Sequence, residues 1–190
     1  MKVILFDIGG VICEDIEKHM MKEISEEYKK DYSFVMKVRD KWWKLYACDK
    51  INEEEYWKGF LKDVGIEEDY SKFVKLPYER YIILKKGIIS YIENLSKKYK
   101  LFIVSDHSKD WWNFANDKFK ISEYFEEKYF SFDYKSLKIE GKLFEEVLKK
   151  VKSEDCLFID NSKENLKIAQ KFGIKGLYFE NVDDLRNLLS

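Results

Sequence analysis

The chain has 190 residues, of which 45% are hydrophobic, so it can bury a core and does not resemble a disordered protein. Its 35 Lys and Arg residues nearly balance its 36 Asp and Glu residues, which argues against a nucleic acid as partner. No apolar run approaches the roughly 18 residues of a membrane span, so we expect no membrane partner either.

The amino terminus begins directly with a strand pattern. Residues 2–6 read KVILF, which is typical of a buried parallel strand, and Asp7 and the pair Gly9-Gly10 follow. This start lacks the features of a secretory signal, so we expect a cytoplasmic protein. The three cysteines show no CxxC spacing, which predicts reduced thiols and neither disulfides nor zinc ligands.

Residues 15–81 differ in texture from the rest of the chain. They are charged and aromatic, and their apolar residues recur at helical spacing. Pro77, the only proline, closes the stretch. The pattern predicts an all-helical insertion of three or four helices that begins soon after the first strand.

Beyond residue 81, helices and strands alternate. We expect helices over residues 82–99, 140–151, 163–172 and 182–189, with a further aromatic-rich helix near residue 112. We expect strands over residues 101–104, 128–132, 156–159 and 176–179. Strands that alternate with helices predict an α/β fold with a parallel sheet.

Polar residues end three of the predicted strands: Asp7, Ser105 with Asp106, and Asp160 with Asn161. Lys138 follows the strand at 128–132 after a brief loop. Because the carboxyl ends of parallel strands share one edge, these groups can meet there. A carboxylate could then attack a phosphoryl group while a hydroxyl and an ammonium hold its oxygens. Gly9 and Gly10 would turn backbone N–H groups towards the same anion.

Four segments resemble, in order, the motifs of the haloacid dehalogenase superfamily. Residues 6–12 (FDIGGVI) resemble the first, 104–106 (VSD) the second, 131–144 (SFDYKSLKIEGKLF) the third and 157–173 (LFIDNSKENLKIAQKFG) the fourth. Residues 49–57 resemble a recurrent cap helix of subfamily IA, whose members carry a small helical cap. The resemblance implies a Rossmann-like parallel sheet core over residues 1–14 and 82–190. It also implies that residues 15–81, here called the cap segment, form a helical cap inserted after the first strand.

The same resemblance implies a phosphatase that acts on a small phosphorylated metabolite. Phosphatases of the family form an aspartyl-phosphate, and magnesium bridges the nucleophile and the phosphate. The implied catalytic residues are Asp7, Ser105 and Lys138, and the implied phosphate-binding residues are Gly9, Gly10, Ser105, Asp106 and Lys138. The implied magnesium ligands are Asp7, the carbonyl of Gly9, Asn161 and its neighbour Asp160.

The chain departs from the family pattern at two acidic positions. Gly9 stands where the phosphatases usually carry a second Asp as general acid and base, which is worth about 10²–10⁴ in rate. Asn161 stands where an Asp usually binds the metal, so we expect weaker magnesium binding. His107 is one alternative proton source, although an exposed histidine at a helix entry is the expectation we prefer.

These departures leave two other functions open. One is a catalytically weak or inactive protein that keeps the fold for binding or regulation. The other is a metal-independent 2-haloacid dehalogenase, against which Gly9 argues because the first motif of those enzymes resembles Asp-x-Tyr-Gly-Thr. The tryptophans of the cap segment predict internal packing, and they leave open a homodimer formed through the aromatic cap.

Overall fold

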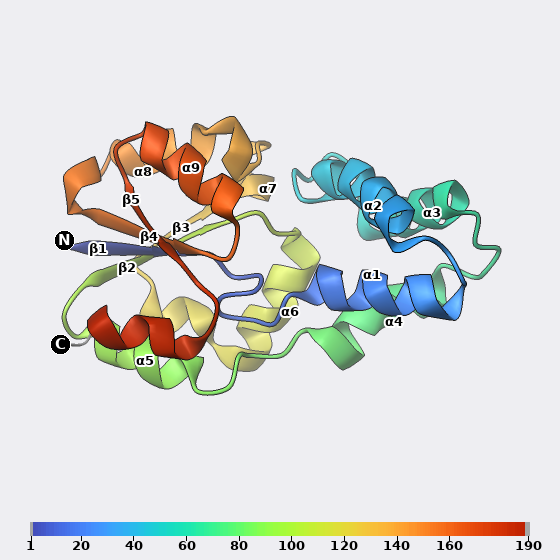
Figure 1. Cartoon of the computed structure of the whole chain (residues 1–190), viewed down its shortest axis with the longest axis horizontal. Coiled ribbons are helices and arrows are strands. Elements are labelled where there is room, and N and C mark those ends of the chain that lie inside the picture. The colour runs from blue at the N-terminus through green and yellow to red at the C-terminus, as the bar shows by residue number, and fades with distance from the viewer. Residues whose placement is uncertain (1, 189–190) are drawn as a thin grey trace.

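The structure, a computed structural model, describes residues 2–188. Its centre is a five-stranded parallel sheet with the strand order β3-β2-β1-β4-β5 (Figure 1). The strands are β1 (Val3–Phe6), β2 (Lys100–Ser105), β3 (Glu127–Phe130), β4 (Cys156–Asp160) and β5 (Lys175–Tyr178). The predicted α/β fold is therefore confirmed.

The middle strand β1 is apolar throughout because helices cover both faces of the sheet. Ile4 and Phe6 point into one part of the core, while Val3 and Leu5 point into the other. In Figure 1 one face carries α5 (Ile88–Ser96) and α6 (Lys109–Phe119), and the opposite face carries α8 (Lys142–Leu148) and α9 (Lys163–Lys171). A strand buried on both faces must be continuously apolar, as this one is.

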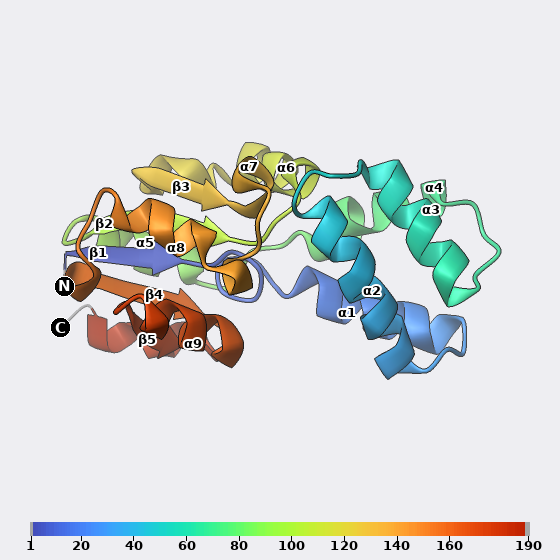
Figure 2. The same cartoon turned by 90° about the horizontal axis from the view of Figure 1, so that it is seen from above.

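The cap segment forms four α-helices between β1 and β2. They are α1 (Ile16–Glu27), α2 (Tyr32–Tyr46), α3 (Glu53–Val64) and α4 (Ser71–Leu76), and a π-helical turn, η1 (Pro77–Tyr81), follows. Figures 1 and 2 show these helices beyond the carboxyl ends of the strands. Asp15 caps α1 by accepting a hydrogen bond from the Lys18 N–H at 3.1 Å. The helices therefore stand over the edge of the sheet where the polar strand ends lie.

The two connections between the sheet and the cap segment run side by side. The Glu14 N–H donates to the Ile83 carbonyl and the Lys85 N–H donates to the Ile12 carbonyl, both at 2.9 Å. Cys13 and Leu84 form an antiparallel bridge between these bonds. The chain therefore enters and leaves the cap segment at one place, next to Asp7.

Several predicted element bounds are wrong. The helix predicted over residues 82–99 begins only at Ile88, because Gly87 adopts a left-handed conformation and the residues before it pair with the other connection. Pro77 opens a π-helical turn where we expected it to close a helical stretch. The helix predicted over 182–189 is the 3-10 helix η5 (Val182–Leu188), and Leu189 lies outside the described residues.

An aromatic cluster joins the cap segment to the sheet domain. Trp111 of α6 lies 5.3 Å, between ring centroids, from Trp43 of α2, and its Nε1 donates to Glu53 Oε1 at 2.8 Å. Trp57 is fully buried. The expectation that these tryptophans serve internal packing is confirmed for Trp43 and Trp57, and the homodimer stays a prediction.

Candidate active site

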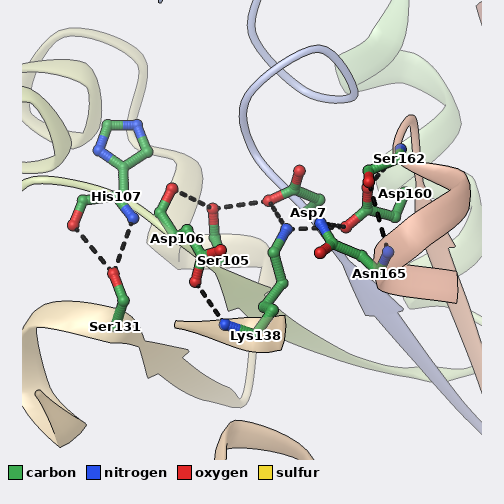
Figure 3. A network of polar contacts seen from close by, with 9 residues as sticks. All are labelled: Asp7, Ser105, Asp106, His107, Ser131, Lys138, Asp160, Ser162 and Asn165. Atoms are coloured by element: carbon green, nitrogen blue, oxygen red, sulfur yellow. Dashed lines mark hydrogen bonds and ion pairs between the residues drawn. The ribbon is translucent and has the colours of Figure 1, made fainter. Parts of the chain in front are cut away.

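Asp7 lies at the carboxyl end of β1, at the centre of the sheet. Its N–H donates to the Ile159 carbonyl of β4 at 3.0 Å, which fixes the backbone in the sheet. The side chain is buried, and its Oδ1 accepts from Ser105 Oγ at 2.7 Å and from Lys138 Nζ at 2.8 Å (Figure 3). The convergence predicted for Asp7, Ser105 and Lys138 is therefore present.

Lys138 reaches this point from the 3-10 helix η3 (Lys138–Glu140), which follows the short helix α7 (Ser131–Tyr134). Its ammonium lies between two carboxylates, with Asp160 Oδ2 at 2.7 Å and Asp7 Oδ1 at 2.8 Å. Its own N–H donates to Asp106 Oδ1 at 2.8 Å. Burial alone would lower the pKa of Lys138, but the charges of Asp160, Asp7 and Asp106 raise it well above its usual value.

Asp160 organises the other side of the ammonium. Besides binding Lys138, its Oδ2 accepts from Asn165 Nδ2 at 3.1 Å, and its Oδ1 accepts from the Ser162 N–H at 2.6 Å. The carboxyl is fully buried, and burial raises its pKa although Lys138 opposes the effect. Both oxygens of Asp160 are thus bound by protein donors.

A cavity of about 500 Å³ opens above Asp7. On the core side its lining includes Asp7, Gly9, Asp106, His107, Lys138 and Asn161. On the side of the cap segment its lining includes Asp15, Glu17, Arg39 and Trp43. The sequence did not indicate that Glu17 and Arg39 belong to this cavity, because no local pattern shows which face of a cap helix meets the sheet.

The two glycines after Asp7 have different surroundings. An ideal Cβ on Gly9 would have no atom within 4 Å, whereas one on Gly10 would lie 2.0 Å from Asn161 Nδ2. Gly10 has a φ of +80° and donates its N–H to the Cys13 carbonyl at 2.9 Å. The turn itself thus uses the Gly10 N–H, and Gly10 is not among the residues that line the cavity, so its role in phosphate binding stays a prediction.

His107 is buried, so the prediction of an exposed histidine is wrong. Its N–H donates to Ser131 Oγ at 3.0 Å, and its ring Nδ1 lies 3.0 Å from the Ser108 carbonyl. In Figure 3 the ring points away from Asp7. Burial lowers its pKa to about 4, so the imidazole is neutral near pH 7.

Ser131, which we did not single out from the sequence, connects the site to the cap segment. Its Oγ donates to the Ala47 carbonyl, at the end of α2, at 2.6 Å and accepts from the His107 N–H. Ser131 is fully buried. In the sequence, its place at the start of the third motif was the one feature that could have pointed to Ser131 as a residue of the site.

A Ser131→Ala substitution is expected to lower the free energy of unfolding by about 1–3 kcal/mol, because it leaves the Ala47 carbonyl and the His107 N–H buried without their partner. Urea unfolding measures the change. Ser33→Ala, at an exposed position of α2, is the matched control and is expected to stay within about 0.5 kcal/mol. Equal losses in the two variants would contradict the connecting role of Ser131.

Of the four residues predicted to bind magnesium, only Asp7 brings a carboxylate to the cavity. Asp7, Gly9 and Asn161 line the cavity, whereas Asp160 does not. Asp7 Oδ1 and Asp160 Oδ2 both bind the Lys138 ammonium, so the cation that these two oxygens share is the lysine. Within residues 2–188 there is no group of three or more His, Cys, Asp or Glu suited to a metal. A carboxylate, an amide and a carbonyl are ligands that a hard cation accepts together with water.

Within the described part of the chain, no helix combines the length and the apolar character needed to cross a membrane.

A family model described as haloacid dehalogenase-like hydrolase matches residues 4–179. The chain is also 37% identical over 150 residues to the chloroplast protein flavin mononucleotide hydrolase 1 of Arabidopsis thaliana. The match covers 78% of this chain and 60% of that protein, so the chain spans about 60% of the length of this curated relative.

Solved structures share the fold. A HAD family enzyme from Bacteroides thetaiotaomicron superposes with a TM-score of 0.79 at 22% identity, covering 100% of this chain and 98% of the other. The wild-type form of that enzyme in complex with magnesium and inorganic phosphate gives 0.75 at 21% identity, with both chains covered completely. L-2-haloacid dehalogenase from Xanthobacter autotrophicus gives 0.69 at 15% identity, covering 98% and 81%. The family model matches from β1 to the end of the last strand of the sheet, β5. The chain therefore belongs to the haloacid dehalogenase-like hydrolases.

Proposed function

We propose that this hydrolase is a phosphatase acting on a small phosphorylated metabolite, with Asp7 as the nucleophile. The observation that carries the proposal is the buried Asp7 carboxylate beneath a cavity of about 500 Å³, with Ser105 Oγ and Lys138 Nζ on one of its oxygens. A carboxylate oriented by a hydroxyl and an ammonium at the floor of a cavity is suited to attack on phosphorus.

The reaction follows from these positions. A carboxylate oxygen of Asp7 attacks phosphorus, and the bond to the leaving oxygen breaks with its electrons on that oxygen, which takes up one proton; the products are an aspartyl-phosphate and an alcohol. Lys138 Nζ and Ser105 Oγ are the nearest donors for the negative charge on the phosphoryl oxygens. Asp160 and Asp106 position Lys138 through its ammonium and its N–H. Water then attacks phosphorus, which releases inorganic phosphate and restores the Asp7 carboxylate.

Magnesium is the proposed cofactor, and when bound it neutralises charge on the phosphate. The Asp7 carboxylate, the Gly9 carbonyl and the Asn161 amide would hold it, since all three residues line the cavity. The Bacteroides thetaiotaomicron enzyme of the same fold was crystallised with magnesium and inorganic phosphate. Asp160 contributes through Lys138, because protein donors bind both of its oxygens.

Removal of magnesium by EDTA is expected to abolish phosphate release from p-nitrophenyl phosphate, and added magnesium is expected to restore it. Asn161→Asp supplies a second carboxylate and is expected to lower the magnesium concentration at half-maximal rate by about tenfold or more. Asn113→Asp, at an exposed position of α6 outside this cavity, is the matched control and should not produce such a shift. Full activity in EDTA would contradict the role of the metal.

A panel of phosphorylated metabolites, with flavin mononucleotide as its first member because of the curated relative, tests the function itself. Release of phosphate from one or more members supports the proposal. Halide release from a 2-haloacid without metal would indicate the dehalogenase instead. Activity in neither assay would indicate the binding or regulatory protein.

The domain division belongs to the same proposal. Residues 15–81 would act as the cap that selects the substrate, over a core of residues 1–14 and 82–190. The paired connections at Cys13 and Leu84 support this division, because the chain enters and leaves the four helices at one place. A cytoplasmic location and a homodimer through the aromatic cap remain predictions.

A further inference from the structure

The proposed phosphatase needs a proton donor, and Gly9 cannot be one. The leaving oxygen of an alkyl phosphate departs as an alkoxide unless an acid protonates it. We propose that Glu17, in the first turn of α1, is the catalytic acid and base that delivers this proton. This inference rests on the proposed function and adds a catalytic residue to it.

Glu17 lines the same cavity as Asp7, and one of its carboxylate oxygens has no hydrogen-bond partner among the described residues. Its side chain is 17% exposed, and its Oε2 accepts from Arg39 Nη1 at a long 3.5 Å. Its Oε1 is buried and has no hydrogen-bond partner among the described residues, and the same is true of Arg39 Nε. Buried polar atoms in native proteins are normally satisfied, so these two atoms are suited to a bound molecule.

The position of Glu17 fits the direction of the reaction. In an in-line displacement the leaving oxygen points away from the nucleophile, and Asp7 lies at the floor of the cavity on the core side. Helix α1 begins beyond the carboxyl end of β1, on the side of the cap segment (Figures 1 and 2). An acid for the leaving group belongs on that side, and Glu17 is a cap residue that lines the cavity.

The charges around Glu17 suit an acid that works near neutral pH. Burial raises its pKa to about 7, while the guanidinium of Arg39 opposes the increase. Asp15 before the helix, Asp40 of α2 and Asp106 after β2 add to the increase, and the hydroxyl of Tyr56 on α3 also lies within electrostatic range. Both protonation states are then populated near pH 7, as an acid that later acts as a base requires.

The other titratable groups of the cavity are less suited to protonate the leaving oxygen. The neutral His107 has no proton to give as an acid near pH 7. Burial raises the pKa of Asp106 to about 7 as well, but its Oδ1 accepts the Lys138 N–H, on the core side of the cavity. Asp15 Oδ1 caps α1. Glu164 lines the cavity from α9 of the core and is exposed.

The proton balance closes over the two steps. When the phosphorus–oxygen bond to the leaving group breaks, the protonated Glu17 gives its proton to that oxygen and becomes a carboxylate. When water attacks the aspartyl-phosphate, the Glu17 carboxylate takes a proton from the water. The bond between phosphorus and Asp7 breaks with its electrons on Asp7, and Glu17 is protonated again.

The test uses two leaving groups in the full-length protein with magnesium. Glu17→Gln is expected to lower kcat/KM for an alkyl phosphate about 10²-fold or more. With 2,4-dinitrophenyl phosphate, whose leaving group needs no proton, kcat/KM is expected to change less than about threefold. With the alkyl phosphate, kcat/KM of the unchanged protein is expected to fall above pH 7, and this fall should be absent in Glu17→Gln. An equal loss with both substrates would overturn the proposal and leave Glu17 a positioning role.

Two further variants separate chemistry from folding. Because a Cβ on Gly9 meets open space, Gly9→Asp is expected to restore alkyl phosphate hydrolysis in the Glu17→Gln background. Glu164→Gln, the same change on the core side of the cavity, is expected to leave the ratio between the two substrates unaltered. Failure of the Gly9→Asp rescue, or a changed ratio in Glu164→Gln, would count against Glu17.

Thermal unfolding reports on the Glu17 carboxyl without any catalysis. Its pKa is raised from 4.5 to about 7 in the folded protein, so the folded state binds more protons between these values and loses stability as the pH rises. Glu17→Gln should therefore gain in Tm relative to the unchanged protein between pH 5 and pH 8, and a constant difference would contradict the raised pKa. If the unchanged protein releases no phosphate from either substrate, the proposed function fails, and this thermal result still stands.

Discussion

A Lys138→Met variant is expected to unfold at pH 8 with a free energy about 3–5 kcal/mol lower than that of the unchanged protein. The Lys138 side chain is 2% exposed, and its ammonium lies 2.7 Å from Asp160 and 2.8 Å from Asp7. Methionine fills a similar volume but leaves two buried carboxylates without their cation. Removing one partner of a buried ion pair is costly because the remaining charge has lost its solvation.

The loss of stability in Lys138→Met should depend on pH. Burial already raises the pKa of Asp160 and Lys138 opposes the increase, so without Lys138 the folded state binds a proton there more readily than the unfolded chain, and stability rises as the pH falls. Denaturant unfolding at pH 5 and pH 8 should show the smaller deficit at pH 5. Lys100→Met is the matched control, because Lys100 pairs with Glu126 at an exposed site and should change stability far less. A deficit that is equal at both pH values would contradict the electrostatic origin.

The second large effect concerns Asp7. Asp7→Asn is expected to lower phosphate release about 10³-fold or more, because an amide oxygen is a far weaker nucleophile than a carboxylate. The amide has nearly the same shape and can still accept the hydrogen bond from Ser105 Oγ, so the variant should remain folded. Phosphate release and thermal unfolding, measured on the same preparation, separate the two effects.

Asp155→Asn provides the control for Asp7→Asn. Asp155 precedes β4 at the opposite edge of the sheet, where it pairs with the exposed Lys2. The same chemical change there should leave the rate unaltered. Residual activity above about a tenth in Asp7→Asn, with the fold intact, would rule out Asp7 as the nucleophile.

The sheet and the gathering of the site could be predicted because both depend on local patterns. A run such as KVILF is compatible only with burial on both faces, and a parallel sheet brings the ends of its strands to one edge. Asp7, Ser105 and Asp160 therefore meet at that edge. Lys138 could be placed from the resemblance of its motif.

The sequence could not indicate which groups are already bound and which are free. The Gly10 N–H is used by its own turn, and both oxygens of Asp160 are used by donors from three different positions. Glu17 looks like an ordinary charged residue in a helix, because its burial depends on how α1 packs against α2. Such facts arise from tertiary packing, and no spacing rule within one segment encodes them.

The order of the strands also determines when the site can come into being during synthesis. β1 is made first, but its partners begin at Lys100 and Cys156. The helices of the cap segment contact one another locally and need no later part of the chain to form those contacts. Asp7 cannot meet Ser105, Lys138 and Asp160 until the chain has been made as far as β4 and has left the ribosome. Until then the apolar β1 has unpaired edges on both sides, which leaves it open to aggregation with other chains.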